Sequence, residues 1–121
     1  MATEWLESVS DIGSIAICRV VQMGALRILT RPSIMGEYVL SGAQAWMAVT
    51  RFMEDDRFAF AAEPGILMES WRIICNSLPT GMSAEIDAYL AAFALAGGYR
   101  LVTLDKGMVR FHGIELVLLR S

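Results

Sequence analysis

The first third of the chain alternates between the apolar spacing of a strand and that of a helix. Residues 14–18 (S-I-A-I-C) form a short apolar run with β-branched side chains, which is typical of a buried strand. Apolar side chains then recur at helical spacing through residues 24–30, and we expect Pro32 to end this helix because proline has no amide hydrogen to donate. Residues 2–8 have a helical pattern without a start signal of their own, so they are predicted to be the tail of a helix that begins earlier.

A capping box begins the next predicted helix. Ser41 and Gln44 stand at the S-x-x-Q spacing, in which each side chain can bind the backbone amide of the other residue. An apolar stripe at helical spacing follows, made of Ala45, Trp46, Val49, Phe52 and Met53. The acidic residues 54–56 close this helix, and the alternating, phenylalanine-rich residues 57–61 predict a second strand.

A third helix is predicted after Pro64, because proline suits the first position of a helix. Its apolar positions recur at helical intervals, at Leu67, Trp71, Ile74 and Cys75. Residues 76–81 (N-S-L-P-T-G) are rich in turn formers. The sequence therefore predicts a loop after this helix.

The most apolar helix and a strand follow this loop. Residues 83–98 predict a helix with Ser83 as its N-cap and the glycines at 97 and 98 as its C-cap. Residues 99–105 (Y-R-L-V-T-L-D) predict a buried strand, and residues 114–119 predict the last one. Strands that alternate with helices of this length indicate βαβ units. We therefore expect an α/β fold, with one domain over residues 1–121 and a mainly parallel sheet flanked by helices in three layers.

The composition is 55% hydrophobic, with a mean hydropathy of +0.49, so a membrane span has to be considered. The longest charge-free run near the acidic helix, residues 88–99, has 12 positions, whereas a span needs about 20. The start, M-A-T-E-W-L-E, is acidic where a secretory signal would be basic. We expect a cytoplasmic protein that does not cross a membrane.

The cysteine, histidine and charge content excludes several classes of site. Cys18 and Cys75 are far apart, and His112 is the single histidine, which argues against a zinc site and a disulfide scaffold. The net charge of -3 gives no general attraction to nucleic acid. Nine of the ten basic residues are arginine, and three of them form either a local basic strip or a solvated helix face, namely Arg19, Arg27 and Arg31.

Two aspartates are the strongest candidates for chemistry. Asp87 lies in the first turn of the apolar helix, and Asp105 stands where the following strand ends. Ligands of α/β folds collect beyond the carboxyl ends of parallel strands, and carboxylate oxygens suit Mg²⁺ or Mn²⁺. The alternative is structural: Asp87 complements the helix dipole and Asp105 starts a turn. The pattern alone leaves both interpretations open.

Three motifs give the chain a family resemblance. They are L-R-I-L-T-R-P at residues 26–32, D-A-Y-L-A-A-F-A at residues 87–94 and R-L-V-T-L-D at residues 100–105. Together with weaker agreement at residues 57–64 and 111–114, they resemble the PIN domain, specifically the VapC-type toxins of bacterial toxin-antitoxin systems. The resemblance runs through nearly the whole chain.

The resemblance implies a function and a site. PIN domains hold one or two divalent metals in a cluster of acidic residues and use them to cleave RNA. Asp87 and Asp105 match two of those acidic positions, so the resemblance implies that both are catalytic metal ligands for Mg²⁺ or Mn²⁺. It also implies RNA and an antitoxin-type protein as partners. Arg27 and Lys106 are candidate phosphate contacts.

The sequence departs from the family pattern at the other acidic positions. A first strand ending in a D-x-N motif is absent, and the chain starts in what would be the second helix. Gly24 stands where the family often has a glutamate, with Gln22 the nearest polar side chain. Ile86 replaces a common Thr or Ser, and Glu85 points about 200° away from Asp87 around the helix. We therefore expect an N-terminally truncated PIN-like domain with an incomplete metal site and impaired ribonuclease activity; a misplaced start would explain the truncation equally well.

A missing central strand would leave a gap of about 9–10 Å in the sheet. Exposed strand edges and the high apolar content favour a homodimer or larger oligomer, with exchange of elements as one route. The alternative function is therefore a non-catalytic PIN-like remnant that oligomerises or binds an antitoxin-like peptide. Trp5, Trp46 and Trp71 are predicted to be core or interface residues, and His112 a surface residue.

Overall fold

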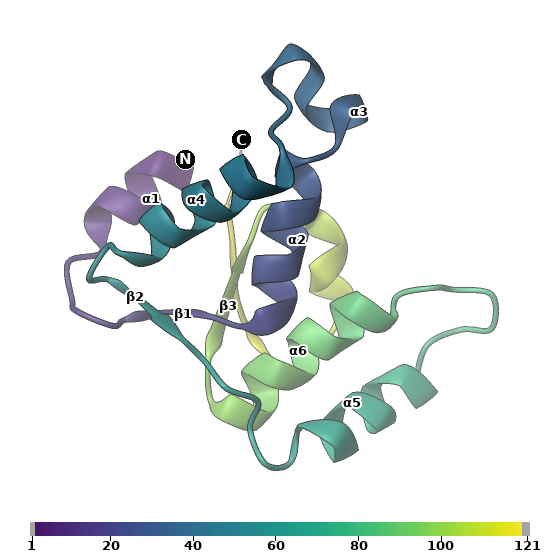
Figure 1. Ribbon diagram of the computed structural model, residues 1–121. Helices are drawn as coiled ribbons and strands as arrows, with labels where there is room; N and C mark the ends of the chain where they lie inside the picture. The colour runs from purple at the N-terminus through teal and green to yellow at the C-terminus, as the bar shows by residue number, and fades with distance from the viewer. Residues whose placement is uncertain (1, 120–121) are drawn as a thin grey trace. The chain divides into compact units, whose positions relative to one another are not determined.

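The computed structural model describes residues 2–119, which form two compact units (Figure 1). The N-terminal unit comprises residues 6–62, and the C-terminal unit comprises residues 63–119 together with residues 2–5, so the boundary falls within the first helix. The helices and strands up to residue 62 are α1 (Ala2–Ser8), β1 (Ile15–Ile17), α2 (Arg19–Leu29), α3 (Pro32–Met35), η1 (Gly36–Tyr38), α4 (Gly42–Met53) and β2 (Phe58–Phe60). Those that follow are α5 (Leu67–Asn76), α6 (Glu85–Gly97), β3 (Arg100–Thr103), η2 (Lys106–Arg110) and β4 (Glu115–Leu118).

The N-terminal unit is built around a parallel pair of strands. β1 lies beside β2, with Ile15 opposite Phe58 and Ile17 opposite Phe60. The chain between them passes through α2 and α4, which contact each other, so the segment is a βαβ unit. Val49 of α4 and Phe58 of β2 are buried. The strands predicted at residues 14–18 and 57–61 are therefore confirmed, each slightly shorter than expected.

Local signals in this unit fixed some helix ends and not others. The capping box is present: Gln44 N–H donates to Ser41 Oγ at 3.2 Å, and Ser41 N–H donates to Gln44 Oε1 at 2.9 Å. Pro32, however, does not end the preceding helix. α2 has already ended at Leu29, where the Thr30 hydroxyl donates to the Leu26 carbonyl at 2.8 Å, and Pro32 begins α3 instead. Thr30 competes with the helix for a backbone carbonyl, which the proline rule does not consider.

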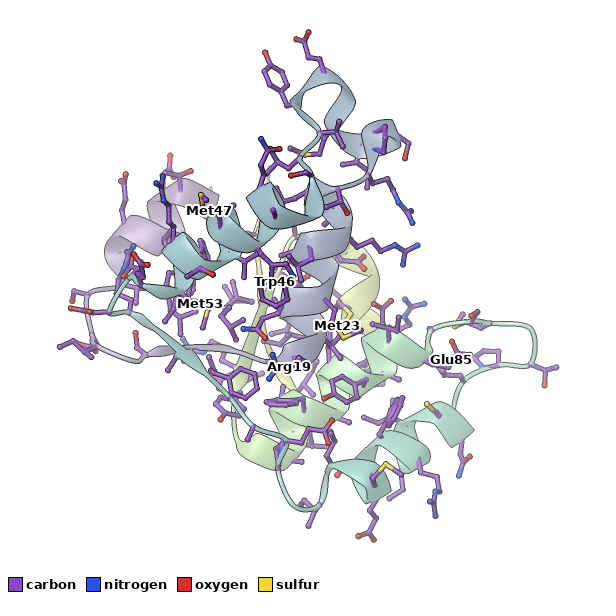
Figure 2. The ribbon with its side chains drawn as sticks, viewed as in Figure 1. Arg19, Met23, Trp46, Met47, Met53 and Glu85 are labelled. Carbon is purple, nitrogen blue, oxygen red and sulfur yellow. The ribbon has the colours of Figure 1, made fainter. Side chains whose placement is uncertain are left out.

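Several large apolar side chains of α2 and α4 face solvent (Figure 2). Met23 is 60% exposed, Trp46 54% and Met47 61%. Trp46 is therefore not a core residue, although its spacing matched the buried Ala45 and Val49. Exposed apolar side chains that cluster on one pair of helices are typical of an interaction surface.

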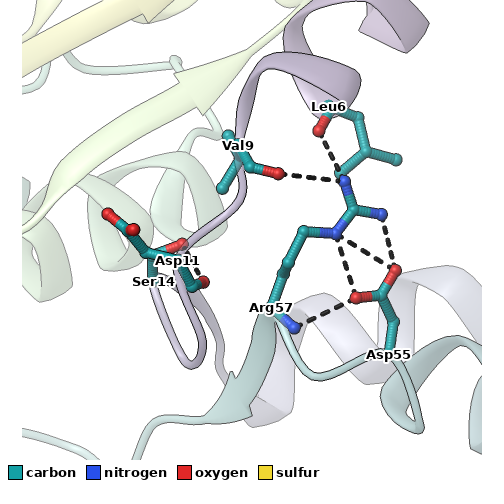
Figure 3. A network of polar contacts seen from close by, with 6 residues as sticks. All are labelled: Leu6, Val9, Asp11, Ser14, Asp55 and Arg57. Carbon is teal, nitrogen blue, oxygen red and sulfur yellow. Dashed lines mark hydrogen bonds and ion pairs between the residues drawn. The ribbon is translucent and has the colours of Figure 1, made fainter.

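Arg57 holds the loop after α1 against the start of β2 (Figure 3). Its guanidinium Nη1 donates to the carbonyls of Leu6 at 2.6 Å and Val9 at 3.3 Å. Its other nitrogens bind the Asp55 carboxylate, at 3.0 Å from Nε and 2.5 Å from Nη2. These hydrogen bonds from Arg57 lower the pKa of Asp55 from 3.8 to about 2. One side chain thus satisfies two backbone carbonyls and a carboxylate at once.

The C-terminal unit packs two helices and a parallel strand pair around a small core. α5 lies along α6, and β3 pairs with β4, with Arg100 opposite Glu115 and Thr103 opposite Leu118. The fully packed centre consists of Ala88, Ala91, Met108 and Phe111, with the partly buried side chains of Trp71, Ile74, Cys75, Leu78, Leu90, Leu101, Ile114 and Leu116 against it. Trp71 also donates its indole N–H to the Glu85 carbonyl at 2.9 Å, which ties α5 to the first turn of α6.

Two predicted helix starts in this unit are wrong, and one helix end is confirmed. Pro64 does not begin α5; the helix starts at Leu67, whose amide donates to the Pro64 carbonyl across a turn. Ser83 does not cap α6, because its hydroxyl donates to the Glu85 carboxylate at 3.0 Å, and Ala84 precedes the helix without a side-chain cap. Gly98 ends α6 as predicted, in the left-handed conformation with φ 70°.

The fold class is α/β with short parallel strand pairs, as the sequence predicts. The described strands pair as two two-stranded sheets, β1 with β2 and β3 with β4. The single three-layer sheet therefore remains an expectation. Within residues 2–119, no helix is long and apolar enough to cross a membrane. Cys18 and Cys75 are both free, and Cys18 is buried.

Replacing Gly98 with alanine should lower the free energy of unfolding by about 1–2 kcal/mol, because an L-residue is strained in the left-handed region. Gly65→Ala is the matched control in the same unit. A Cβ at either glycine meets nothing within 4 Å, but only Gly98 has a positive φ. Denaturant unfolding followed by circular dichroism measures the unfolding free energy of both variants. Equal stabilities of the two variants would contradict the assignment of Gly98 as a strained cap.

The Asp55–Arg57 pair should make stability depend on acidity. Because the pKa of Asp55 is lowered to about 2 in the folded protein, its contribution is complete above the ordinary pKa of 3.8 and is lost as the pH falls toward 2. The native chain should therefore exceed Asp55→Asn in unfolding free energy at pH 5, and this difference should shrink between about pH 4 and pH 2. Denaturant titrations at several pH values measure the difference. A gap that stayed constant down to pH 2 would rule out this linkage.

Candidate functional site

Asp87 is placed by the most buried helix of the molecule. α6 buries Ala88, Ala91 and Ala92 completely, and these small side chains let its neighbours approach closely. Asp87 precedes Ala88 at the edge of that face, and its side chain remains 33% exposed. In the first turn its carboxylate also lies near the positive end of the helix dipole. Asp87 is therefore fixed in position by the packing and yet reachable from solvent.

Asp105 lies two residues beyond the end of β3, at the start of η2. Its Oδ1 accepts a hydrogen bond from the Gly107 amide at 2.8 Å, and its own amide donates to Thr103 Oγ1 at 3.0 Å. These two bonds fix the turn by which the chain leaves the strand. The structural role that the sequence allowed for Asp105 is therefore confirmed. The residue is exposed, so the same carboxylate also has free lone pairs.

The short helix η2 brings a third charged residue to these aspartates. Met108 is 2% exposed and Phe111 9%, and both pack against Ala88 and Ala91 of α6. This anchoring turns Arg110 toward the first turn of α6. Arg110 Nη2 lies 3.2 Å from Asp87 Oδ2.

Arg110 and Asp105 both approach Gly107. A Cβ added at Gly107 would stand 3.1 Å from Asp105 Oδ1 and 3.2 Å from Arg110 Nη2, so both groups border the space that glycine leaves free. The guanidinium carbon stands 5.3 Å from the centre of the Phe111 ring, and Nη1 reaches the Met82 sulfur at 3.5 Å. The structure thus pairs Arg110 with Asp87 and brings the same guanidinium to the space beside Gly107 that Asp105, 18 positions after Asp87, also borders.

Two carboxylates are a small but sufficient number of protein ligands for a hard divalent cation. Mg²⁺ is commonly held by one or two carboxylates together with waters and substrate phosphates. Asp87 and Asp105 provide two carboxylates, and residues 2–119 contain no cluster of three or more acidic, histidine or cysteine side chains arranged to hold a metal. Any metal here would therefore depend on water and phosphate for most of its ligands.

The remaining predicted residues do not join this cluster. The Glu85 carboxylate accepts a hydrogen bond from the Ser83 hydroxyl at 3.0 Å. Ile86 is 62% exposed, and Lys106 is exposed next to Asp105. His112 is at the surface, as predicted.

The other candidates belong to the N-terminal unit. Gly24 and Arg27 lie on α2, and Gln22 accepts a hydrogen bond from Arg19 Nη1 at 2.7 Å. Gln22 also lines an apolar groove of about 260 Å³ between α2 and α4. The other lining residues are Ile17, Val21, Ala25, Leu29, Ala48, Val49, Phe52 and Met53. This groove has the chemistry of a surface for apolar side chains rather than for a metal.

Arg110 was not identified from the sequence. It lies five positions after Asp105, a spacing that matches neither a helix face nor a strand face. The available signal was the pattern of Met108 and Phe111 around it, because two large apolar side chains three apart in a short connection indicate a buried turn. Recognising that turn would have placed Arg110 near the end of β3.

Comparison with known proteins gives two relatives. The chain is 41% identical over 119 residues to "Ribonuclease VapC41" from Mycobacterium tuberculosis, in both strain CDC 1551 and strain H37Rv. The matched region covers 95% of this chain and 82% of each relative. No family model matches the sequence.

Replacing Met108 with alanine should lower the free energy of unfolding by about 2–5 kcal/mol, because it opens a cavity against α6. Val109→Ala is the control in the same short helix: Val109 is 59% exposed, so its replacement should change stability by less than about 0.5 kcal/mol. Thermal unfolding measures both variants. A Met108→Ala protein as stable as Val109→Ala would show that η2 is not anchored through this side chain.

Proposed function

The chain belongs to the VapC-type toxin ribonucleases, and we propose that it is a metal-dependent endoribonuclease in which Asp87 and Asp105 are the metal ligands. The observation that carries this proposal is that Arg110, which pairs with Asp87, borders the same space beside Gly107 as Asp105, just beyond the end of β3. In α/β folds this end of a strand is where ligands bind. Both residues also match acidic positions of the family that the sequence resembles.

Each aspartate contributes to the proposed chemistry through its own surroundings. Asp105 is held by the Gly107 amide, which orients one oxygen and leaves the other for a ligand. Asp87 is held at the edge of the buried face of α6. A bound Mg²⁺ or Mn²⁺ would lower the pKa of a coordinated water and offset the charge that develops on the phosphate. Lys106, exposed next to Asp105, is positioned to contact an RNA phosphate, and Arg27 is a second candidate.

Two carboxylates predict a weak metal site. Ligands that come from the substrate bind only when RNA is present, so metal affinity should rise in the complex with RNA. The net charge of -3 offers no general attraction to RNA, so RNA binding would depend on local contacts. We therefore expect slow cleavage unless a specific RNA structure fits the site.

The groove of the N-terminal unit favours a second candidate function, the binding of a protein partner. Its lining is almost entirely apolar, and the neighbouring Met23, Trp46 and Met47 are exposed. An amphipathic helix of an antitoxin-type protein is the kind of segment that lies in such a groove. The same surface would support a homodimer or larger oligomer. On this second proposal the chain binds partners without cleaving RNA.

Manganese binding separates the two functions. Isothermal titration of the full chain with Mn²⁺ should give a dissociation constant below about 1 mM, equivalent to a binding free energy of about 4 kcal/mol. The double variant Asp87→Asn, Asp105→Asn keeps the side-chain shape and should lose this binding. In parallel, the native chain should cleave RNA only when Mg²⁺ or Mn²⁺ is present.

If the native chain and the double variant bound Mn²⁺ equally weakly while both remained folded, the catalytic proposal would be wrong. The partner-binding function would then be the better explanation of the apolar groove. Circular dichroism of both proteins verifies the fold.

A further inference from the structure

We propose that Arg110 is a built-in counter-ion of the carboxylate pair, and that a divalent cation must displace it from Asp87 in order to bind. The inference deepens the proposed metal-dependent activity and rests on it. It assigns to Arg110 control over the metal affinity of the site. Arg110 is a positioning residue in this role, because it acts on the ligands of the metal.

The direct observation is the ion pair between Arg110 and Asp87. Nη2 donates to Oδ2 at 3.2 Å, and the two side chains are 37% and 33% exposed. Partial burial weakens the screening of this pair by solvent and salt. The hydrogen bond uses lone-pair capacity of a carboxylate oxygen that a metal would also require.

Contacts on its other sides hold the guanidinium at this place. The ring of Phe111, itself buried against α6, stands 5.3 Å from the guanidinium carbon, within the range of a cation–π contact. The Met82 sulfur accepts from Nη1. These contacts and the buried Met108 fix the backbone and the side chain of Arg110 together, so its position near Asp87 does not depend on one bond.

Gly107 allows the arginine to lie beside the second carboxylate as well. Any larger residue would place its Cβ 3.1 Å from Asp105 Oδ1 and 3.2 Å from Arg110 Nη2, so these side-chain ends would have to shift by a few tenths of an ångström. Glycine at this position therefore leaves Arg110 Nη2 and Asp105 Oδ1 free to border the same space.

An arginine differs from a bound metal in ways that matter for affinity. Its guanidinium holds a carboxylate through N–H donors as well as through its charge. A divalent cation approaching Asp87 meets the repulsion of this charge and must also break its hydrogen bond. Removal of the arginine charge should therefore strengthen metal binding, whereas loss of structure would weaken it.

The same unit contains a matched control. Arg100 Nη2 lies 3.2 Å from Glu115 Oε1, the same distance as in the Arg110–Asp87 pair. These side chains are 60% and 68% exposed, and they occupy paired positions at the start of β3 and β4, whereas Asp105 follows the end of β3. Arg100→Gln thus removes one charge and one ion pair without touching the carboxylate pair.

The test is Mn²⁺ titration of the full-length native chain, Arg110→Gln, Arg110→Lys and Arg100→Gln, by calorimetry and by the electron paramagnetic resonance signal of free Mn²⁺. Arg110→Gln should bind Mn²⁺ about three- to fivefold more tightly than the native chain, the size expected when one partly exposed ion pair no longer competes. Arg110→Lys keeps the charge and should stay within about twofold of the native value. Arg100→Gln should also match the native chain.

An Arg110→Gln protein that bound Mn²⁺ as weakly as the native chain, or more weakly, would overturn the inference. If the native chain bound Mn²⁺ and lost it in the Asp87→Asn, Asp105→Asn variant, the proposed function would survive that result. Equal tightening in Arg110→Gln and Arg100→Gln would also overturn the inference, because it would reduce the effect to net charge. If no variant bound Mn²⁺, the metal site itself would be wrong and the inference would fall with it.

Discussion

The contact of Ala88 and Ala91 with Met108 and Phe111 is the constraint on which the C-terminal unit depends. Alanine is small enough for η2 to lie directly on α6, and the two large apolar side chains of η2 fill the space between them. This packing fixes the positions of the neighbouring residues. Asp87 precedes Ala88, and Arg110 lies between Met108 and Phe111, so burial of the apolar residues determines where the charged residues meet.

This arrangement also offsets the negative charges of Asp87 and Asp105. Two carboxylates near each other repel, and the repulsion grows as water is excluded. Arg110 beside Asp87 and the Gly107 amide at Asp105 offset that cost with one full charge and one backbone dipole. The site is therefore stable as a folded structure in its own right, and its affinity for a metal is a separate property that the same groups set.

In the N-terminal unit, the hydrogen bonds of Arg57 hold the chain in place. Its core is small, and Arg57 replaces part of the missing apolar packing by binding two carbonyls and Asp55. Much of the apolar surface of α2 and α4 stays exposed around the groove. Polar contacts thus hold the loops of this unit, while many of its apolar side chains remain exposed.

The sequence by itself determined the order of the longer helices and of the strands, the α/β class, the capping box at Ser41 and the glycine end of α6 at Gly98. These features depend on neighbours within about four residues, which the pattern contains. Through their motifs it also predicted Asp87 and Asp105 as the candidate site residues, and this assignment stays a prediction. It misjudged Pro64 and Ser83, where a turn and a nearby carboxylate replaced the expected helix starts. Only the tertiary structure decided that Arg110 pairs with Asp87, because that position results from packing η2 on α6, a contact between residues about 20 positions apart that no local spacing encodes.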